Sequence, residues 1–246
     1  MEISNSMYVY LLVGLSTFLG AVLQSVTGFG LGLVVITTLP FFLSSYSLCL
    51  ALSTVTGFLV ALFGAIRMRK FVEWRLMAAP VSTYLLINYF AVRLSSIGPD
   101  ALLQKLLGGF LFLLSIYFIV AAGKIKIKPT FRNGLIAGGI GGILSGLFGT
   151  GGPPIAIYML AASKDSKGYI ANTQLYFACT TLIAIANRYM NGQLTMEVLP
   201  FTAVIIAAIL LGLFIGSKIF NKLNVETLKK TVYVVIGLSG LVLVLK

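Results

Sequence analysis

An otherwise apolar part of the chain is interrupted by Ser145-Gly146-Leu147-Phe148-Gly149-Thr150-Gly151-Gly152-Pro153-Pro154. A second apolar run is interrupted by Gln24-Ser25-Val26-Thr27-Gly28-Phe29-Gly30-Leu31-Gly32. Gly28 and Gly149 are 121 residues apart in a chain of 246, as are Gly30 and Gly151. Two interrupted apolar segments in corresponding positions of two halves are typical of the substrate site of a membrane transporter.

The composition is that of a membrane protein. Hydrophobic residues make up 59% of the chain and charged residues only 10%, with a mean hydropathy of +1.03. A soluble domain carries roughly 25% charged residues. Several apolar runs reach the length of about 20 residues that crosses a bilayer as a helix. The sequence therefore predicts an all-α polytopic membrane protein.

Several functional classes are excluded by what the chain lacks. It contains no histidine, and Cys49 and Cys179 lie in apolar segments without a second cysteine nearby, so no metal site is expected. We expect no cofactor and no enzymatic activity, because the predicted membrane core contains no carboxylate and no acid–base pair. The net charge of +12 lies in short loops, where membrane orientation explains it, so nucleic acid is not an expected partner.

The first apolar run, residues 7–44, is too long for one straight crossing, since a helix of that length would span roughly 57 Å. If each interrupted run crossed the membrane once, the basic residues would divide ten to eight between the two sides. If each run instead folds back as a hairpin, they divide fourteen to four, and the four are Arg93, Lys105, Arg188 and Lys246. The positive-inside rule favours the hairpin, although the kinked single crossing stays open.

The hairpin interpretation predicts two halves, residues 1–123 and 124–246, within one membrane domain. Each half would contain one hairpin and three full crossings, an odd number. The halves would therefore lie upside down relative to each other, an architecture common among transporters.

The two breaks are candidate binding sites for an anion. Irregular backbone at membrane depth is tolerated only where it is buried or lines a wetted cavity. A half-helix that begins there presents unpaired N–H groups and the positive end of its dipole. An alternative for part of the second run is close helix packing by small residues, since Gly138, Gly142 and Gly146 recur every four residues. The candidate substrate-binding residues in the breaks are Gln24, Ser25, Thr27, Gly28, Gly30, Ser145, Gly149, Thr150, Gly151 and Gly152.

Two further pairs follow from the same offset. Ser53 and Gln174 occupy equivalent positions in the crossings after the breaks, and we include both as candidate substrate-binding residues. Arg67 and Arg188 end equivalent crossings. Their side chains either extend to the membrane interface or attract anions at opposite mouths of the protein, in a gating role.

The sequence resembles the TauE/SafE family of sulfite and organosulfonate exporters. The resemblance is carried by Gly134-Leu135-Ile136-Ala137-Gly138 through the second break, and by Gly20 through Gly32 followed by Pro40. It implies a multi-pass protein of the prokaryotic plasma (inner) membrane. It also implies transport, with export favoured, of small sulfur-containing anions such as sulfite or sulfonates.

The residues alone lead only as far as a small anionic substrate and a lipid bilayer as partners. An anion channel and a non-transporting membrane assembly factor are the alternatives. The oligomeric state stays open, with a homodimer as one option.

Overall fold

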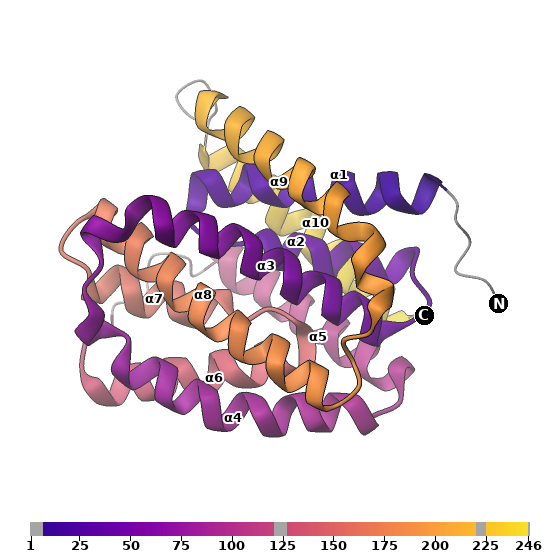
Figure 1. Cartoon of the computed structure of the whole chain (residues 1–246), viewed down its shortest axis with the longest axis horizontal. Coiled ribbons are helices and arrows are strands. Elements are labelled where there is room, and N and C mark those ends of the chain that lie inside the picture. The colour runs from indigo at the N-terminus through magenta and orange to yellow at the C-terminus, as the bar shows by residue number, and fades with distance from the viewer. Residues whose placement is uncertain (1–6, 121–126, 220–224, 246) are drawn as a thin grey trace.

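The computed structural model describes residues 7–120, 127–219 and 225–245, and the predicted all-α class is confirmed because these residues contain no strand (Figure 1). The predicted boundary between residues 123 and 124 lies outside the described residues, as do Lys124, Lys126, Lys222 and Lys246 of the charge count. The helices are α1 (Met7–Thr27), α2 (Leu31–Thr38), α3 (Tyr46–Met68), α4 (Ala78–Ile97), α5 (Asp100–Val120), α6 (Phe131–Phe148), α7 (Gly152–Ala162), α8 (Ser166–Met190), α9 (Leu199–Ile219) and α10 (Val225–Leu245).

Five segments are long and apolar enough to cross a membrane, by length and composition: Met7–Ser25, Tyr46–Phe71, Asp100–Val120, Ser166–Met190 and Met196–Lys218. Large apolar side chains cover the outer faces of the helices, among them the exposed Phe90, Leu113 and Phe214. These side chains would be costly in water and suit contact with lipid.

Both predicted helix breaks are confirmed. Helix α1 ends at Thr27 and α2 begins at Leu31, while α6 ends at Phe148 and α7 begins at Gly152. Gly28 has φ of 81° and its counterpart Gly149 has φ of 67°. This left-handed backbone favours glycine and ends each helix abruptly.

After each break the chain turns back along the helix that it has just left. A Cβ built on Gly20 of α1 would lie 3.1 Å from the Cα of Leu31, the first residue of α2. In the second half, a Cβ on Gly151 would collide with the carbonyl oxygen of Gly141, and Gly134 lies against the ring of Tyr158. Such close backbone approach requires glycine, so these glycines let each half-helix pack on its predecessor.

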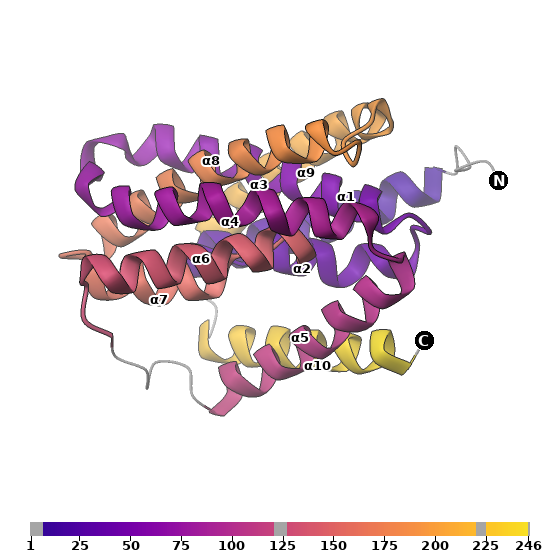
Figure 2. The ribbon, with the colours of Figure 1, turned by 90° about the horizontal axis from the view of Figure 1, so that it is seen from below.

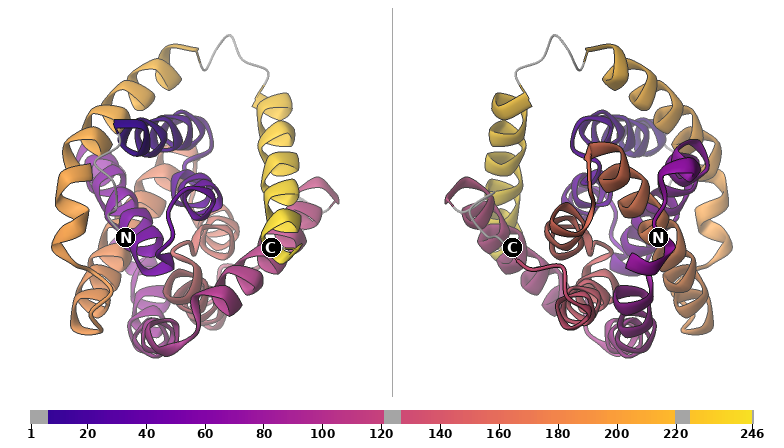
Figure 3. Two further views of the ribbon diagram at one scale, coloured as in Figure 1. Left: turned by 90° about the vertical axis from the view of Figure 1, so that its right-hand side faces the viewer. Right: turned by 90° about the vertical axis from the view of Figure 1, so that its left-hand side faces the viewer.

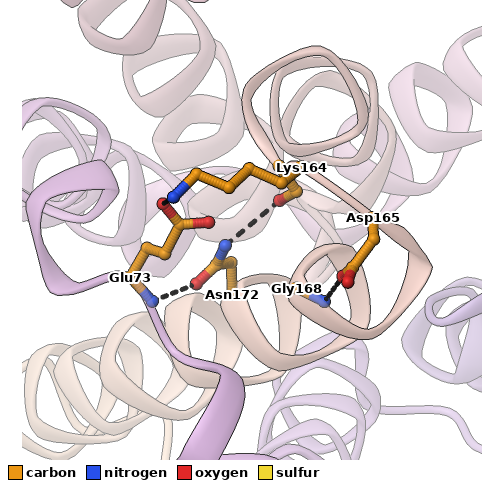
Figure 4. A network of polar contacts seen from close by, with 6 residues as sticks. Glu73, Lys164, Asp165, Gly168 and Asn172 are labelled. Carbon is orange, nitrogen blue, oxygen red and sulfur yellow. Dashed lines mark hydrogen bonds and ion pairs between the residues drawn. The ribbon is translucent and has the colours of Figure 1, made fainter.

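The loop after α3 and the loop before α8 meet at one end of the molecule, which we call the Glu73 end (Figure 4). Lys164 Nζ lies 3.5 Å from Glu73 Oε2, and the Glu73 amide donates to Asn172 Oδ1 at 2.8 Å. Asn172 Nδ2 in turn donates to Ser163 Oγ at 3.1 Å. Straight crossings at both breaks would place these two loops on opposite sides of the membrane, so their contact agrees with the hairpin interpretation.

The other end, which we call the Asp100 end, contains the start of α3 and the end of α4. The Tyr46 amide donates to Asp100 Oδ2 at 3.0 Å, and Gln193 Nε2 donates to Ser95 Oγ at 3.0 Å. Helix α1 also begins at this end, where the ring of Tyr10 lies 4.8 Å from that of Phe201 at the start of α9. The first hairpin therefore starts and finishes at the Asp100 end.

The main helix pairs join the two halves: α4 packs on α6, α1 on α9, α3 on α8 and α5 on α10 (Figures 2 and 3). Gly138 meets the backbone of Pro80, and Gly146 meets Ala91, so the small-residue packing predicted for α6 is confirmed. In the equivalent pair, Gly212 of α9 meets Ala21 of α1. These pairs surround the two breaks and bring them together in the interior.

Candidate functional site

A cavity of about 60 Å³ lies between the two breaks. This is room for a few water molecules or one small ion. Helices α2, α3, α7 and α8 contribute to its wall, together with the ends of α1 and α6 and Tyr84 of α4. The lining residues are Gln24, Gly30, Gly32, Ser53, Gly57, Tyr84, Ser145, Gly149, Thr150, Gly151, Gly152, Tyr176, Phe177, Thr180 and Thr181.

The structure places most of the candidate residues from the sequence at this cavity and the rest behind its wall. Those that line it are Gln24, Gly30, Ser53, Ser145, Gly149, Thr150, Gly151 and Gly152. Ser25 and Thr27 turn back along α1, where their hydroxyls donate to the carbonyl oxygens of Val22 and Leu23. Gly28 and Gln174 form hydrogen bonds directly behind the wall.

Two hydrogen bonds cross between the halves at equivalent positions. Ser53 Oγ lies 3.2 Å from the carbonyl oxygen of Gly149 and 3.2 Å from that of Gly32. Gln174 Nε2 donates to the carbonyl oxygen of Gly28 at 3.3 Å. Ser53 and Gln174 are 121 residues apart, as are Gly28 and Gly149. Each side chain thus binds the left-handed glycine that breaks the opposite half.

Gln24 joins the first break to α8. Its Oε1 accepts the Leu31 amide at 3.2 Å, which satisfies the first N–H of α2, and its Nε2 donates to Gln174 Oε1 at 3.4 Å. The side chain amides of Gln24 and Gln174 therefore fix the start of α2 against the crossing helix α8. Both side chains are buried, where an amide without partners would be costly.

The two short helices begin at the cavity. Gly30 and Gly32 at the start of α2, and Gly151 and Gly152 at the start of α7, form part of its wall. The first N–H groups of a helix have no partner within it, and its dipole is positive at this end. In α2 the Leu31 amide is already bound by Gln24, and in α7 Pro153 and Pro154 have no N–H, so the amides that can face the cavity are those of Gly32 and Gly152. The opposite, negative ends of α1 and α6 lie nearby, but the carbonyl oxygens of Gly28 and Gly149 accept the hydrogen bonds from Gln174 and Ser53.

The side chain of Arg188 lies inside the protein with 0% exposure. Its Nε donates to Thr54 Oγ1 at 2.9 Å and its Nη1 to Gln193 Oε1 at 2.7 Å. Its Nη2 donates to the carbonyl oxygens of Ser145 and Gly146 at 2.7 and 3.1 Å. These carbonyls belong to the last turn of α6, so the guanidinium neutralises the negative end of a helix that points at the cavity.

Burial contradicts the interfacial interpretation for Arg188, whereas Arg67 is exposed at the Glu73 end, as that interpretation predicts. No carboxylate of the described residues contacts Arg188. The carboxylates whose side chains the structure describes lie in loops or at helix starts: Glu73, Asp100, Asp165 and Glu197. Next to the cavity wall, the protein therefore carries a buried positive charge that is held only by neutral oxygens.

Two tyrosines of the cavity wall were missed by the sequence analysis. Tyr176 is 1% exposed, and its hydroxyl has no hydrogen-bond partner within the described residues. Tyr84 lies edge-on to it, and the Tyr84 hydroxyl is 2.6 Å from Ser145 Oγ. A buried tyrosine hydroxyl normally finds a partner, which makes Tyr176 a candidate ligand contact; the buried hydroxyls of Thr17 and Thr173 also have no partner within the described residues, but neither residue lines the cavity. From sequence, a tyrosine in an apolar helix is interpreted as a packing residue, so no sequence signal could have identified Tyr176 as part of the site.

Comparisons with known proteins agree on one family. Residues 12–243 match the family model described as Sulfite exporter TauE/SafE. A protein of Cupriavidus necator named "Probable sulfite/organosulfonate exporter TauE" is 23% identical over 93% of this chain and 92% of its own length. The "Probable membrane transporter protein YdhB" of Bacillus subtilis is 24% identical over 63% of this chain and 66% of its own length. No solved structure matches the chain.

Proposed function

The chain belongs to the sulfite exporter TauE/SafE family of membrane transporters, and from this premise we propose that it exports a small sulfur-containing oxyanion such as sulfite or an organosulfonate. The substrate binds in the cavity between the two helix breaks. The protein is a multi-pass protein of the cell membrane, and the substrate crosses the membrane through it without a cofactor and without chemical change.

The unpaired Tyr176 hydroxyl carries this proposal. Sulfite and sulfonate oxygens accept hydrogen bonds, and the cavity wall offers them donors: the hydroxyls of Tyr176 and Thr150 and the amides of Gly32 and Gly152 at the starts of α2 and α7. A cation would find no charged partner, because no described carboxylate lines the cavity. The chemistry of the wall therefore favours an anion.

Electrostatics supports both the sign of the charge and the direction of transport. The buried Arg188 raises the potential beside the cavity, and no described carboxylate lines it. An inside-negative membrane potential favours the exit of an anion by about 2.3 kcal/mol per charge per 100 mV. Export can then proceed without a proton relay. Arg67, exposed at the Glu73 end, attracts the anion toward the cytoplasmic mouth.

The architecture that we propose is a pair of inverted halves, residues 1–123 and 124–246, each with one hairpin and three crossings. Three observations support it: the hairpins start and finish at opposite ends, the pairs α1–α9 and α4–α6 are equivalent, and Ser53 and Gln174 make equivalent bonds. The hairpin tips meet at the cavity, as expected for a transporter with inverted repeats. Gly28, Gln24 and Gln174 hold the first tip in place, and Ser25 and Thr27 stabilise the end of α1.

The proposal is tested by reconstituting the purified protein in liposomes and measuring sulfite flux. We expect the sulfite flux of the natural protein to saturate with concentration. Tyr176→Phe should weaken the apparent affinity for sulfite about tenfold, because one hydrogen bond to a charged ligand is lost. Thermal stability should not fall, because the variant removes only an unpaired hydroxyl. Tyr84→Phe is the matched control: it breaks the bond to Ser145 and should reduce stability as well.

Two other results would overturn the proposal. Flux that rises linearly with sulfite concentration would indicate an anion channel. No flux of sulfite, thiosulfate or any sulfonate from well-folded protein would indicate a membrane assembly factor. A bulky side chain at Gly151 is a poor test, because it collides with Gly141 and would disrupt the hairpin itself.

A further inference from the structure

A second hollow lies on the outer surface of the protein, between α3 and α8. It has a volume of about 380 Å³ and an almost entirely apolar wall. The lining residues are Phe58, Leu62, Ala65, Ile66, Arg69, Val72, Trp74, Leu175, Ala178, Cys179 and Leu182. They follow one stripe of each helix, so the hollow is a groove along the seam where α3 packs on α8.

The length of this α3–α8 groove matches one leaflet of a bilayer. It extends from Phe58 of α3 to Arg69, the residue that directly follows this helix, over twelve residues or roughly 16 Å. The hydrocarbon core of a bilayer is about 30 Å thick, so one leaflet contributes about 15 Å. The groove therefore runs from the surface at the Glu73 end to near the middle of the membrane.

The surface end of the groove carries the groups that recognise a lipid headgroup. Arg69 and Trp74, both exposed, are there, whereas the deeper wall is formed by residues such as Phe58 and Cys179. Arginine binds phosphate through its planar fork of donors, and tryptophan is enriched at the membrane–water interface. Further exposed cations, Lys70 and Arg75, lie in the same loop region, on the side where anionic lipids are attracted.

We propose that the α3–α8 groove binds one acyl chain of an anionic phospholipid, with the lipid phosphate held by Arg69. An apolar slot of one leaflet's length with a single arginine at its mouth is complementary to such a lipid in shape and in charge. A soluble anion would leave the apolar wall uncovered, and a second protein chain would have to desolvate Arg69 without a described acidic partner.

Binding at this groove connects the lipid to the interior of the protein. Leu175 and Ala178 form the groove, while Phe177, Thr180 and Thr181 of the same helix line the cavity. Ala61, Ala65 and Ala178 pack at the seam, and Gly57 lies against Thr181. An acyl chain in the groove thus contacts one face of α8, while the opposite face of α8 forms part of the cavity wall.

The single tryptophan of the chain, Trp74, makes the groove measurable. The purified protein is reconstituted in mixtures of phosphatidylcholine with brominated phosphatidylglycerol or brominated phosphatidylcholine, and tryptophan quenching is followed. We expect the brominated anionic lipid to quench at a relative binding constant about fivefold above that of phosphatidylcholine, the preference that one arginine at a membrane surface supplies.

Variants identify the site. Arg69→Ala should reduce the lipid preference to one, while Arg75→Ala, an exposed arginine of the same loop outside the groove, should retain it. Cys179→Phe fills the groove and should lower quenching by acyl-chain bromine without touching the charge. Equal quenching by both lipids in the natural protein, or an unchanged preference in Arg69→Ala, would overturn the proposal. Equal shielding of Trp74 from both lipids, with cross-linking between Cys179 residues of two copies, would overturn it in favour of a dimer.

Discussion

The two helix breaks share a backbone plan but differ in how their carbonyl ends are held. In the first half, the carbonyl oxygen of Gly28 accepts a hydrogen bond from the neutral amide of Gln174. In the second half, Ser53 binds Gly149, and the guanidinium of Arg188 additionally binds the carbonyls of Ser145 and Gly146. The two breaks thus share their backbone geometry but not their charge, and the positive charge beside the cavity comes from Arg188 at the second break.

A comparison of Arg188 with Arg67, the arginine at the equivalent position, shows why only one of the two is buried. Arg188 is buried because Thr54 and Gln193 accept its Nε and Nη1 donors. At the offset of 121 residues, the positions that would serve Arg67 are occupied by Leu175 and Val72. Neither side chain can accept a hydrogen bond, so burying Arg67 would leave its donors unpaired, and its side chain is exposed instead.

The largest effect is expected from removing the buried charge. Arg188→Met removes a donor from four buried acceptors. The Ser145 carbonyl still accepts the Gly149 amide, so up to three are left unsatisfied at about 1–3 kcal/mol each, partly offset because no charge is then buried. We expect a large drop in the thermal unfolding midpoint and anion flux at background. Arg67→Met should change stability by less than about 0.5 kcal/mol. Equal losses of stability and flux in the two variants would show that Arg188 and Arg67 have the same role.

A second variant tests the acceptor rather than the charge. Thr54→Val removes the partner of Arg188 Nε, and leaving that charged donor unpaired should cost about 2 kcal/mol. Thr56→Val is the matched control, since both threonines are buried on α3 and bind carbonyls of their own helix, but only Thr54 contacts Arg188. Unfolding in detergent measures the difference; if the two variants are equally stable, the Arg188 contact contributes nothing.

The smallest effects are expected for the neutral bonds that cross between the halves. Gln174→Met keeps the volume but loses the bonds to Gly28 and Gln24, which should cost about 1–2 kcal/mol. Ser53→Ala loses a single hydroxyl and should cost about 1 kcal/mol. Both should weaken sulfite transport while the protein stays folded. A stability loss from either variant as large as that of Arg188→Met would mean that charge is not the main difference between the breaks.

The breaks were predictable because glycines that interrupt an apolar run mark them directly. The constant offset of 121 residues also linked Ser53 to Gln174, but as candidate substrate-binding residues, whereas the structure shows both bonded to the glycines of the breaks. The basic residues of the loops favoured the hairpin, which agrees with the contact between Glu73 and Lys164. These signals need no knowledge of which helices pack together.

The burial of Arg188 and the unpaired hydroxyl of Tyr176 were not predictable, because both depend on contacts between distant segments. Arg188 and Arg67 end equivalent crossings. Arg188 is buried and Arg67 is exposed because of how α8 packs against α3 and α6. Tyr176 resembles any aromatic residue of a membrane helix until its neighbours are in place. Sequence periodicity describes a helix face but not the chemistry of the face that it meets.

The pairing of α1 with α9 and of α4 with α6 makes each part of the chain depend on the other. A half-length chain would have α1 without α9 and α4 without α6, and would expose the close-packed glycine surfaces that these pairs cover, such as Gly138 against Pro80. Such a shortened chain could cover those surfaces only by associating with a second copy of itself. Because one chain carries both sets of helices, the two sets can differ, and only the second contains a buried arginine.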